Sequence, residues 1–215
     1  MNREQMKSIL IIANGEPPRD KLIKKLIEKS DCIIAADGGS NFCYKKNIYP
    51  HFIIGDLDSI DPKALSYFKD SEIIHLTEQD THDLNKAITF AKTLKPVVIR
   101  IVAAFGRRLD HSIANLLLLQ SDSDQIMLEF YEDQGQLTAI SSDKTLNLPI
   151  GQMVSLFSFL PVYGLSLCGF KYSLQNRDFP EGFNGLSNII AADNAQISFK
   201  RGLLFLYIFH EDNSA

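Results

Sequence analysis

Apolar and polar positions alternate in blocks along the first 130 residues, with two different periods. Short continuous apolar runs have the length of buried β-strands, and the segments between them repeat apolar residues every third or fourth position, as amphipathic helices do. The pattern predicts strands at 8–13, 32–36, 52–54, 72–76 and 97–103, and helices at 18–29, 40–46, 61–68, 83–94 and 110–120. This alternation favours a mainly parallel, Rossmann-like sheet with helices on its faces.

The pattern changes after about residue 127. Short apolar runs, such as 137–140, 153–160, 196–199 and 203–209, are then separated by Gly, Pro, Asn and Asp, and only 188–194 looks helix-like. Short strands between turn residues are typical of an antiparallel sandwich or barrel. We therefore predict an α/β domain over residues 1–130 and an all-β sandwich domain over residues 131–215.

Composition and charge exclude several classes of protein. With 45% hydrophobic and 22% charged residues, the chain of 215 residues has the composition of an ordinary soluble globular protein. The net charge of -4 offers no general attraction to nucleic acid or to an anionic membrane, so neither is an expected partner. The three cysteines form no CxxC motif and cannot all pair, and no apolar run has the length of a membrane span. We expect a cytoplasmic protein.

Two carboxylates follow the third predicted strand directly. Asp56 and Asp58 stand at alternate positions after Gly55. Carboxylates this close repel each other unless a cation lies between them, and a divalent metal is the simplest candidate. Because aspartate and glycine also populate ordinary turns, a turn without a metal is the alternative interpretation. The metal interpretation predicts a Mg²⁺-dependent enzyme that acts on phosphates.

Further acidic groups follow the neighbouring predicted strands. Asp37 ends the second strand, and Asp80 and Asp83 flank the start of the helix at 83–94. Taken alone, Asp80 and Asp83 could simply cap that helix, and Lys86 could be a solvated surface lysine or could reach a phosphate. Because open parallel sheets bind ligands beyond the carboxyl ends of their strands, we expect these groups to lie along one edge of the sheet.

A glycine turn with two arginines follows the fifth predicted strand. Guanidinium groups suit phosphate oxygens, and of the two we expect Arg108 to contact a ligand and Arg107 to be exposed on the surface. The sequence contains no GxxxxGK[ST] loop, no GxGxxG fingerprint, no GxSxG elbow and no zinc-like spacing of histidines. A phosphate-binding P-loop and a dinucleotide site of the usual type are therefore excluded.

Taken together, these motifs resemble those of the thiamin pyrophosphokinase family. The matching segments are Ala36-Asp37-Gly38-Gly39, Gly55-Asp56-Leu57-Asp58-Ser59, Gln79-Asp80 with Asp83 and Lys86-Ala87, and Gly106-x-Arg108-Leu109-Asp110-His111 with Ala114-Asn115. Their order and spacing match through the first half of the chain. In the second half, Gly169-Phe170-Lys171-Tyr172 and Ser187-Asn188 are similar to the late motifs of the family. The resemblance covers nearly the whole chain.

The resemblance implies a reaction and a set of roles. The implied reaction transfers pyrophosphate from ATP to the hydroxyl of thiamine, with Mg²⁺, and gives thiamine diphosphate and AMP. It implies a catalytic, ATP-binding domain at 1–130, a thiamine-binding and dimerisation domain at 131–215, and a homodimer with active sites at the subunit interface. The implied residues are Asp56, Asp58 and Asp83 for Mg²⁺ and catalysis, Asp37, Gly38, Gly39, Lys86 and the catalytic Arg108 for ATP, and Gln79, Asp110, Ser187 and Asn188 for thiamine.

Three positions depart from the pattern of the family. Arg107 and Ala103 stand where the family usually has glycine, and His82 stands where it often has threonine. If the loop needs a positive φ angle at the glycine positions, its conformation would be altered here.

Two other functions stay open at this point. Phosphatases of the haloacid-dehalogenase type carry a similar aspartate pair, although after their first strand, so a Mg²⁺-dependent phosphatase or phosphoesterase is the nearest alternative. A non-catalytic protein that binds thiamine or a nucleotide is the second, and the presence of all the carboxylates argues against it.

Overall fold

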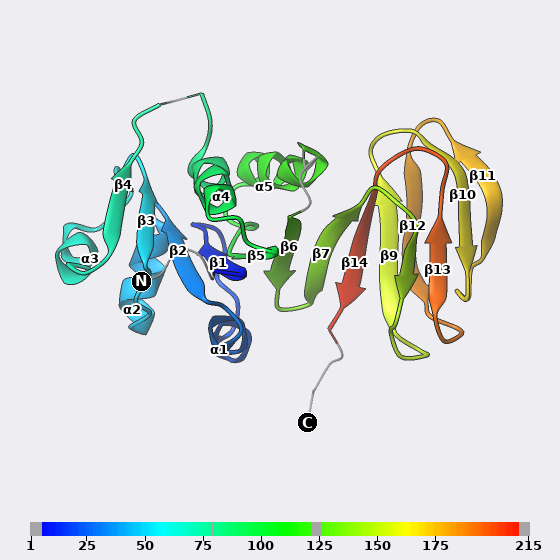
Figure 1. The fold of residues 1–215 in the computed structure, drawn as a ribbon, viewed down its shortest axis with the longest axis horizontal. Coiled ribbons are helices and arrows are strands. Elements are labelled where there is room, and N and C mark those ends of the chain that lie inside the picture. Colours follow the sequence, from blue (N-terminus) through cyan, green and yellow to red (C-terminus); the bar gives the residue numbers. More distant parts are fainter. Residues whose placement is uncertain (1–5, 79, 122–125, 211–215) are drawn as a thin grey trace. The chain divides into compact units, whose positions relative to one another are not determined.

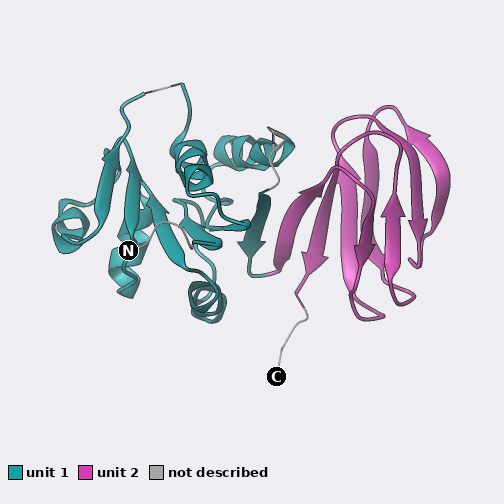
Figure 2. Ribbon diagram, in the orientation of Figure 1, with its two compact units in different colours: residues 1–133 teal, residues 134–215 magenta. Residues whose placement is uncertain are grey.

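The computed structural model describes residues 6–78, 80–121 and 126–210. The chain forms two compact units, residues 1–133 and residues 134–215 (Figure 2).

Strands and helices alternate through the first unit (Figure 1). Its strands are β1 (Ser8–Ile12), β2 (Cys32–Ala36), β3 (Phe52–Gly55), β4 (Glu72–His75), β5 (Val98–Val102) and β6 (Met127–Glu132). Its helices are α1 (Asp20–Glu28), α2 (Gly39–Lys46), α3 (Pro62–Tyr67), α4 (Asp83–Thr93) and α5 (Leu109–Leu117), which continues into a short 3₁₀-helix, η2 (Leu118–Ser121). The alternation predicted from the apolar periods is confirmed.

The strands of this unit lie in the order β4-β3-β2-β1-β5-β6, and each neighbouring pair is parallel. The chain adds strands outward from β1 to β4 and then crosses to the other side of β1 for β5. All these strands therefore end at one edge, where the loops that follow them meet. The position between β1 and β5, where the direction of winding reverses, is the usual ligand site of such a sheet.

Apolar burial on both faces holds the sheet in place. Ile9 to Ile12 of β1 are fully buried, as expected for a parallel strand covered on two sides. On one face, Leu10 and Ile12 belong to a core cluster that includes Ile23 and Leu26 of α1 together with residues of α2 and α3. Helix α4 packs against β1, β2 and β3. Helix α3 begins as its sequence predicts, with Asp61 as its N-cap: the carboxylate accepts a 2.8 Å hydrogen bond from the Lys63 N–H.

The second unit is an all-β sandwich. Its strands are β7 (Gly135–Ile140), β8 (Lys144–Leu146), β9 (Met153–Ser158), β10 (Val162–Cys168), β11 (Leu174–Phe179), β12 (Phe183–Ile189), β13 (Ala195–Ser198) and β14 (Leu204–Phe209). They form two antiparallel sheets, ordered β12-β9-β14-β7 and β11-β10-β13-β8, around a shared apolar core. The predicted fold class, a Rossmann-like α/β domain plus a β-sandwich, is confirmed.

The helix-like interpretation of 188–194 is wrong. Asn188 and Ile189 are the end of β12 and pair with Val154 and Met153 of β9. Ile190 continues in an isolated bridge to Phe170, and the chain then turns before β13. The local preference of this Ile- and Ala-containing segment is overridden by pairing and burial within the sandwich.

Within the described residues, no helix is long and apolar enough to cross a membrane.

Candidate functional site

Three aspartates meet at the carboxyl edge of the parallel sheet. Asp37 follows β2, and Asp56 and Asp58 follow the neighbouring β3. Each has a carboxylate oxygen that lies within 4.8 Å of an oxygen of the other two. Asp37 is buried, Asp56 half-buried and Asp58 exposed, so the group extends from the interior to the surface. Asp56 and Asp58 were predicted as a pair, and the structure brings Asp37 to them.

Gly55 allows the acidic side chains to approach each other over the end of β3. Its φ angle is +153°, which disfavours any other residue, and a Cβ there would lie 2.8 Å from the Cβ of Asp37 and 3.2 Å from Oδ1 of Asp83. The neighbouring loops are also in left-handed conformations, with φ angles of 42° at Asp37 and 69° at Leu57. Such backbone strain is held only where the surrounding structure enforces it, and it is concentrated at functional sites.

Asp83 reaches the same region from the first turn of α4. Its Oδ1 lies 3.5 Å from Nζ of Lys86, and that ammonium also donates a 3.3 Å hydrogen bond to the carbonyl of Leu76. Lys86 is only 5% exposed, so the interpretation as a solvated surface lysine is wrong. Burying an ammonium group costs free energy unless it is paired, and here it is paired with the carboxylate of Asp83.

Burial and mutual repulsion act on these carboxylates. Burial raises the pKa of Asp37. Hydrogen bonding to the Gly38 backbone and to the Ser59 side chain opposes the shift, and the negative charges of Asp83 and Asp56 add to it. Burial also raises the pKa of Asp83, with a further contribution from Asp56, although the charge of Lys86 opposes the shift. Oδ1 of Asp37 and Oδ1 of Asp83 are both buried and have no hydrogen-bond partner among the described residues.

This donor set fits a hard divalent cation. Buried polar atoms in native proteins are almost always satisfied. Among the described residues, Oδ1 of Asp37 has no hydrogen-bond partner. Oδ1 of Asp83, which is not one of the three converging carboxylates, has the ion-pair contact with Lys86 at 3.5 Å but no hydrogen bond. Mg²⁺ in proteins is usually bound by one or two carboxylates together with substrate phosphates. A bound cation would also remove the repulsion between the neighbouring aspartate side chains.

The two arginines of the loop after β5 have different partners. Nε and Nη2 of Arg108 donate to the two carboxylate oxygens of Asp110, at 3.1 Å and 2.5 Å. The hydrogen bond from Arg108 lowers the pKa of Asp110 to about 2. Arg107 is exposed, as expected, and its Nη1 donates to the backbone carbonyl (3.1 Å) and to Oδ1 (3.0 Å) of Asn14.

The loop does require a positive φ angle at the two positions where glycine is replaced. The φ angle is 54° at Arg107 and 55° at Ala103. Both residues therefore adopt the left-handed conformation that a glycine at the same position would adopt without strain. The loop after β1 runs beside this segment: Gly15 N–H donates to Ala103 O (2.6 Å) and Glu16 N–H donates to Phe105 O (2.7 Å).

In the second unit, the two predicted thiamine contacts Ser187 and Asn188 differ in exposure and in hydrogen bonding. Ser187 is exposed at a bulge in β12, with a φ angle of 54°. Asn188 is buried, and its side chain is engaged locally: Oδ1 accepts from Tyr172 N–H (3.0 Å) and Ile189 N–H (2.9 Å), and Nδ2 donates to Tyr172 O (2.9 Å). Asn188 thus holds the segment at Tyr172 in place. Gln79, another of the four predicted thiamine contacts, lies outside the described residues.

Two family models match the chain in succession. The model described as "Thiamin pyrophosphokinase, catalytic domain" matches residues 23–130, which is half of the chain, and "Thiamin pyrophosphokinase, vitamin B1 binding domain" matches residues 138–204. The chain belongs to the thiamin pyrophosphokinase family.

Curated proteins and solved structures agree with this assignment. The chain is 25% identical to thiamin pyrophosphokinase 1 of Caenorhabditis elegans, over 92% of this chain and 88% of the relative. It is 26% identical to thiamine pyrophosphokinase of Bacillus subtilis, over 94% and 98%. The crystal structure of thiamine pyrophosphokinase from B. subtilis has a TM-score of 0.83 at 24% identity, over 95% of this chain and 100% of that one. The enzyme from Candida albicans has a TM-score of 0.82 at 19% identity, over 98% and 91%, and these two structures show that the fold is shared.

As a member of this family the chain is a thiamine diphosphokinase, which forms thiamine diphosphate by transfer of pyrophosphate from ATP. The phosphatase and the non-catalytic binding protein are therefore set aside. The acidic pair also follows β3, whereas a dehalogenase-type nucleophile pair follows the first strand.

Sequence reasoning missed Asn41, which holds the acidic loop of this thiamin pyrophosphokinase family member. From α2, Asn41 Nδ2 donates to Ser59 O (2.7 Å), and its Oδ1 accepts from Asp61 N–H (2.8 Å). Ser59 Oγ in turn donates to Asp58 (2.9 Å). The partners of Asn41 lie 18 and 20 positions further along the chain, so no local sequence pattern signals this contact.

Proposed function

We propose that this thiamine diphosphokinase works with Mg²⁺ held by Asp56, Asp58 and Asp83, with Asp37 completing the acidic group. The observation that carries the proposal is the convergence of carboxylate oxygens from Asp37, Asp56 and Asp58 within 4.8 Å of one another. The unsatisfied Oδ1 of Asp83 beside Gly55 supports the inclusion of that carboxylate. Bound Mg²⁺ would neutralise charge on the triphosphate of ATP and make the β-phosphorus more electrophilic.

The chemistry leaves little covalent work for the protein. The hydroxyl of thiamine loses its proton and its oxygen forms a bond to the β-phosphorus. The bond from that phosphorus to the oxygen bridging to the α-phosphate breaks, and AMP leaves. The protein must position the two substrates in line and stabilise the charge that moves to the leaving oxygen. Asp37 with Gly38 and Gly39 is proposed to contact ATP at the start of α2. Gly39 permits this arrangement, because a Cβ there would lie 2.2 Å from the carbonyl oxygen of Ile12.

Lys86 is proposed to act in two ways. Its contact with Oδ1 of Asp83 at 3.5 Å orients that carboxylate, and its charge partly offsets the excess of negative charge before ATP arrives. The ammonium carries three donors, so it can keep its bond to the carbonyl of Leu76 and still offer a donor to a phosphate oxygen.

Arg108 and Asp110 are proposed to exchange partners when the substrates bind. Their side chains are 66% and 65% exposed, and a solvent-exposed ion pair is weak, so the cost of separating them is small. Arg108 would then bind phosphate oxygens of ATP, and Asp110 would be released to attract the positive charge of thiamine. The pair keeps both groups ordered until that exchange.

The remaining parts of the proposal concern the second unit and the assembly. We propose that residues 131–215 supply thiamine contacts through Ser187 and Asn188, with Gln79 contributing from residues 1–130, in a homodimer with active sites at the subunit interface. The family resemblance of these motifs supports the arrangement. Three free cysteines support a location in the reducing cytoplasm.

A product assay tests the proposal. Purified protein is incubated with ATP, Mg²⁺ and thiamine, and AMP and thiamine diphosphate are quantified together; parallel reactions omit thiamine or replace the metal with EDTA. We expect equal yields of both products and loss of both in either control. Formation of ADP or free phosphate without thiamine, or full turnover in EDTA, would contradict the proposal. Light scattering of the same sample tests the dimer, which a monomeric mass with full activity would refute.

A further inference from the structure

His82 stands directly before Asp83 and uses its side chain in an unexpected way. It is the N-cap residue of α4, with extended backbone angles (φ −83°, ψ 161°), yet its side chain caps none of the helix N–H groups. Its ring Nε2 instead lies 2.8 Å from Oδ1 of Asn115 on α5. The first turn of α4 is thus tied sideways to another helix.

The direction of this hydrogen bond follows from the second contact of Asn115. Asn115 Nδ2 donates a 2.6 Å hydrogen bond to the backbone carbonyl of Ala104, so the other amide atom, Oδ1, is an acceptor. His82 Nε2 must therefore carry the proton and donate it. Asn115 is only 7% exposed, and a buried amide with both ends satisfied is a rigid link.

The link connects the segments that carry the proposed catalytic groups of this unit. His82 precedes Asp83, and Ala104 lies in the loop after β5 that leads to Arg108. The preceding residue, Thr81, makes a local contact, because its Oγ1 donates a hydrogen bond to Oε1 of Glu78 within the same loop. The tie to Asn115 therefore reaches across from the loop before α4 to α5 and to the loop after β5.

We propose that His82 is a positioning residue for Asp83. By donating to Asn115 it holds the first turn of α4 where the carboxylate of Asp83 reaches the acidic group beside Gly55. His82 itself touches no reacting atom in this proposal. The inference rests on the proposed role of Asp83, and it accounts for a histidine at a helix start where a capping residue would be expected.

The substitution His82→Thr separates positioning from stability. Threonine is a good N-cap residue but is too short to reach Asn115, so the link is lost. The new cap should offset much of the stability that is lost when Oδ1 of Asn115 no longer has a donor. We expect kcat to fall about 10-fold, the usual effect of losing a group that orients a metal ligand, with KM for thiamine and ATP changed by less than about 2-fold. Hydrogen exchange of the amides in residues 83–87, measured without substrates or metal, should become faster. His82→Gln, whose side-chain N–H can donate to Asn115, should restore most of both properties.

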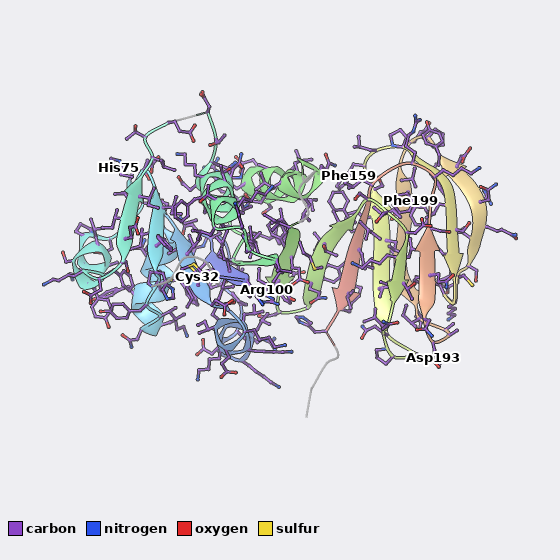
Figure 3. The ribbon with its side chains drawn as sticks, viewed as in Figure 1. Cys32, His75, Arg100, Phe159, Asp193 and Phe199 are labelled. Carbon is purple, nitrogen blue, oxygen red and sulfur yellow. The ribbon has the colours of Figure 1, made fainter. Side chains whose placement is uncertain are left out.

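His75→Thr is the matched control. His75 is an exposed histidine at the end of β4, in the segment that leads to α4 (Figure 3), and we expect its substitution to change neither turnover nor exchange. Wild-type kcat and exchange in His82→Thr would overturn the inference. So would a parallel loss of thermal stability and turnover that His82→Gln does not rescue, because that result indicates a purely structural role.

Asp83→Asn tests the proposed metal-binding role of Asp83 separately from the positioning role of His82. If Asp83→Asn abolishes turnover and His82→Thr has no effect, only the positioning role of His82 is wrong. Normal turnover in Asp83→Asn would overturn the proposed metal-binding role of Asp83, and the inference with it.

Discussion

The loops at the carboxyl edge of the parallel sheet fall into two regions with opposite character. Between β1 and β5, where the direction of winding reverses, the loops that follow these two strands are hydrogen-bonded to each other. The N–H groups of Gly15 and Glu16 donate to the carbonyls of Ala103 and Phe105, and the guanidinium of Arg107 donates to Asn14. At the loops after β2 and β3 and the start of α4, buried carboxylate oxygens of Asp37 and Asp83 have no hydrogen-bond partner among the described residues.

This difference indicates which part of the sheet edge binds a ligand. Polar groups that satisfy one another stabilise the protein, whereas polar groups left unsatisfied at close range must meet a ligand or cost stability. The general rule for open sheets points to the switch point between β1 and β5. In the described part of this chain, the buried carboxylate oxygens without a hydrogen bond lie to one side of it, at the loop after β2 and at the N-terminus of α4.

Removing one carboxylate from the acidic group should have the largest effect on turnover. Asp58→Asn keeps the size and one acceptor of the side chain but removes a charge that would hold the metal. We expect turnover to fall by at least ~100-fold, comparable to losing an electrostatic catalytic group. Because Asp58 is exposed, the thermal unfolding midpoint should stay close to that of the unmodified protein. Asp70→Asn, on another exposed aspartate, is the control, and a near-normal rate in Asp58→Asn would argue against the site.

Crowding the acidic region from the backbone should have an intermediate effect. Gly55→Ala places a methyl group 2.8 Å from the Cβ of Asp37 at a φ angle of +153°, so we expect a loss of unfolding free energy of about 2 kcal/mol or more together with reduced turnover. Gly151→Ala has comparable φ strain, at +94°, but no atom within 4 Å of the added carbon, so it should lose only about 1 kcal/mol and no activity. Denaturant unfolding and the product assay measure both quantities. Equal losses in the two variants would show that steric crowding at Asp37 is unimportant.

Changes at the joined loops should have the smallest effect and should act on stability. Arg107→Ala removes the hydrogen bonds to Asn14 but keeps the left-handed backbone strain, whereas Arg107→Gly removes both. The glycine variant should therefore be more stable than the alanine variant by about 1 kcal/mol, the cost of a left-handed L-residue. Denaturant unfolding curves of the two variants give the difference. If turnover of either variant fell as far as that of Asp58→Asn, the contrast between the two regions would be wrong.

Several features were predictable because they depend on local pattern. The apolar runs and helical periods were enough to predict alternating strands and helices in the first unit, since burial on both faces of a parallel sheet leaves an unmistakable run of apolar residues. The spacing of Asp56 and Asp58 after an apolar strand was enough to predict an acidic site. The helix-like interpretation of 188–194 failed because strand pairing in a sandwich depends on partners that are distant in sequence.

The parallel class of the first sheet and the residue types at its edge could be predicted from the amino-acid sequence alone, and a division into two domains was expected from it. Tertiary structure alone decided which of these residues meet. It brought Asp37 into the acidic group, buried Lys86, and linked His82 to Asn115. The pairs Asp83–Lys86 and Arg108–Asp110, by contrast, join residues only three and two positions apart in the sequence. The physical reason is that periodicity and spacing report which face a residue occupies, whereas a hydrogen bond or an ion pair needs two side chains within a few ångströms, and that separation is set by how the whole sheet and its helices pack.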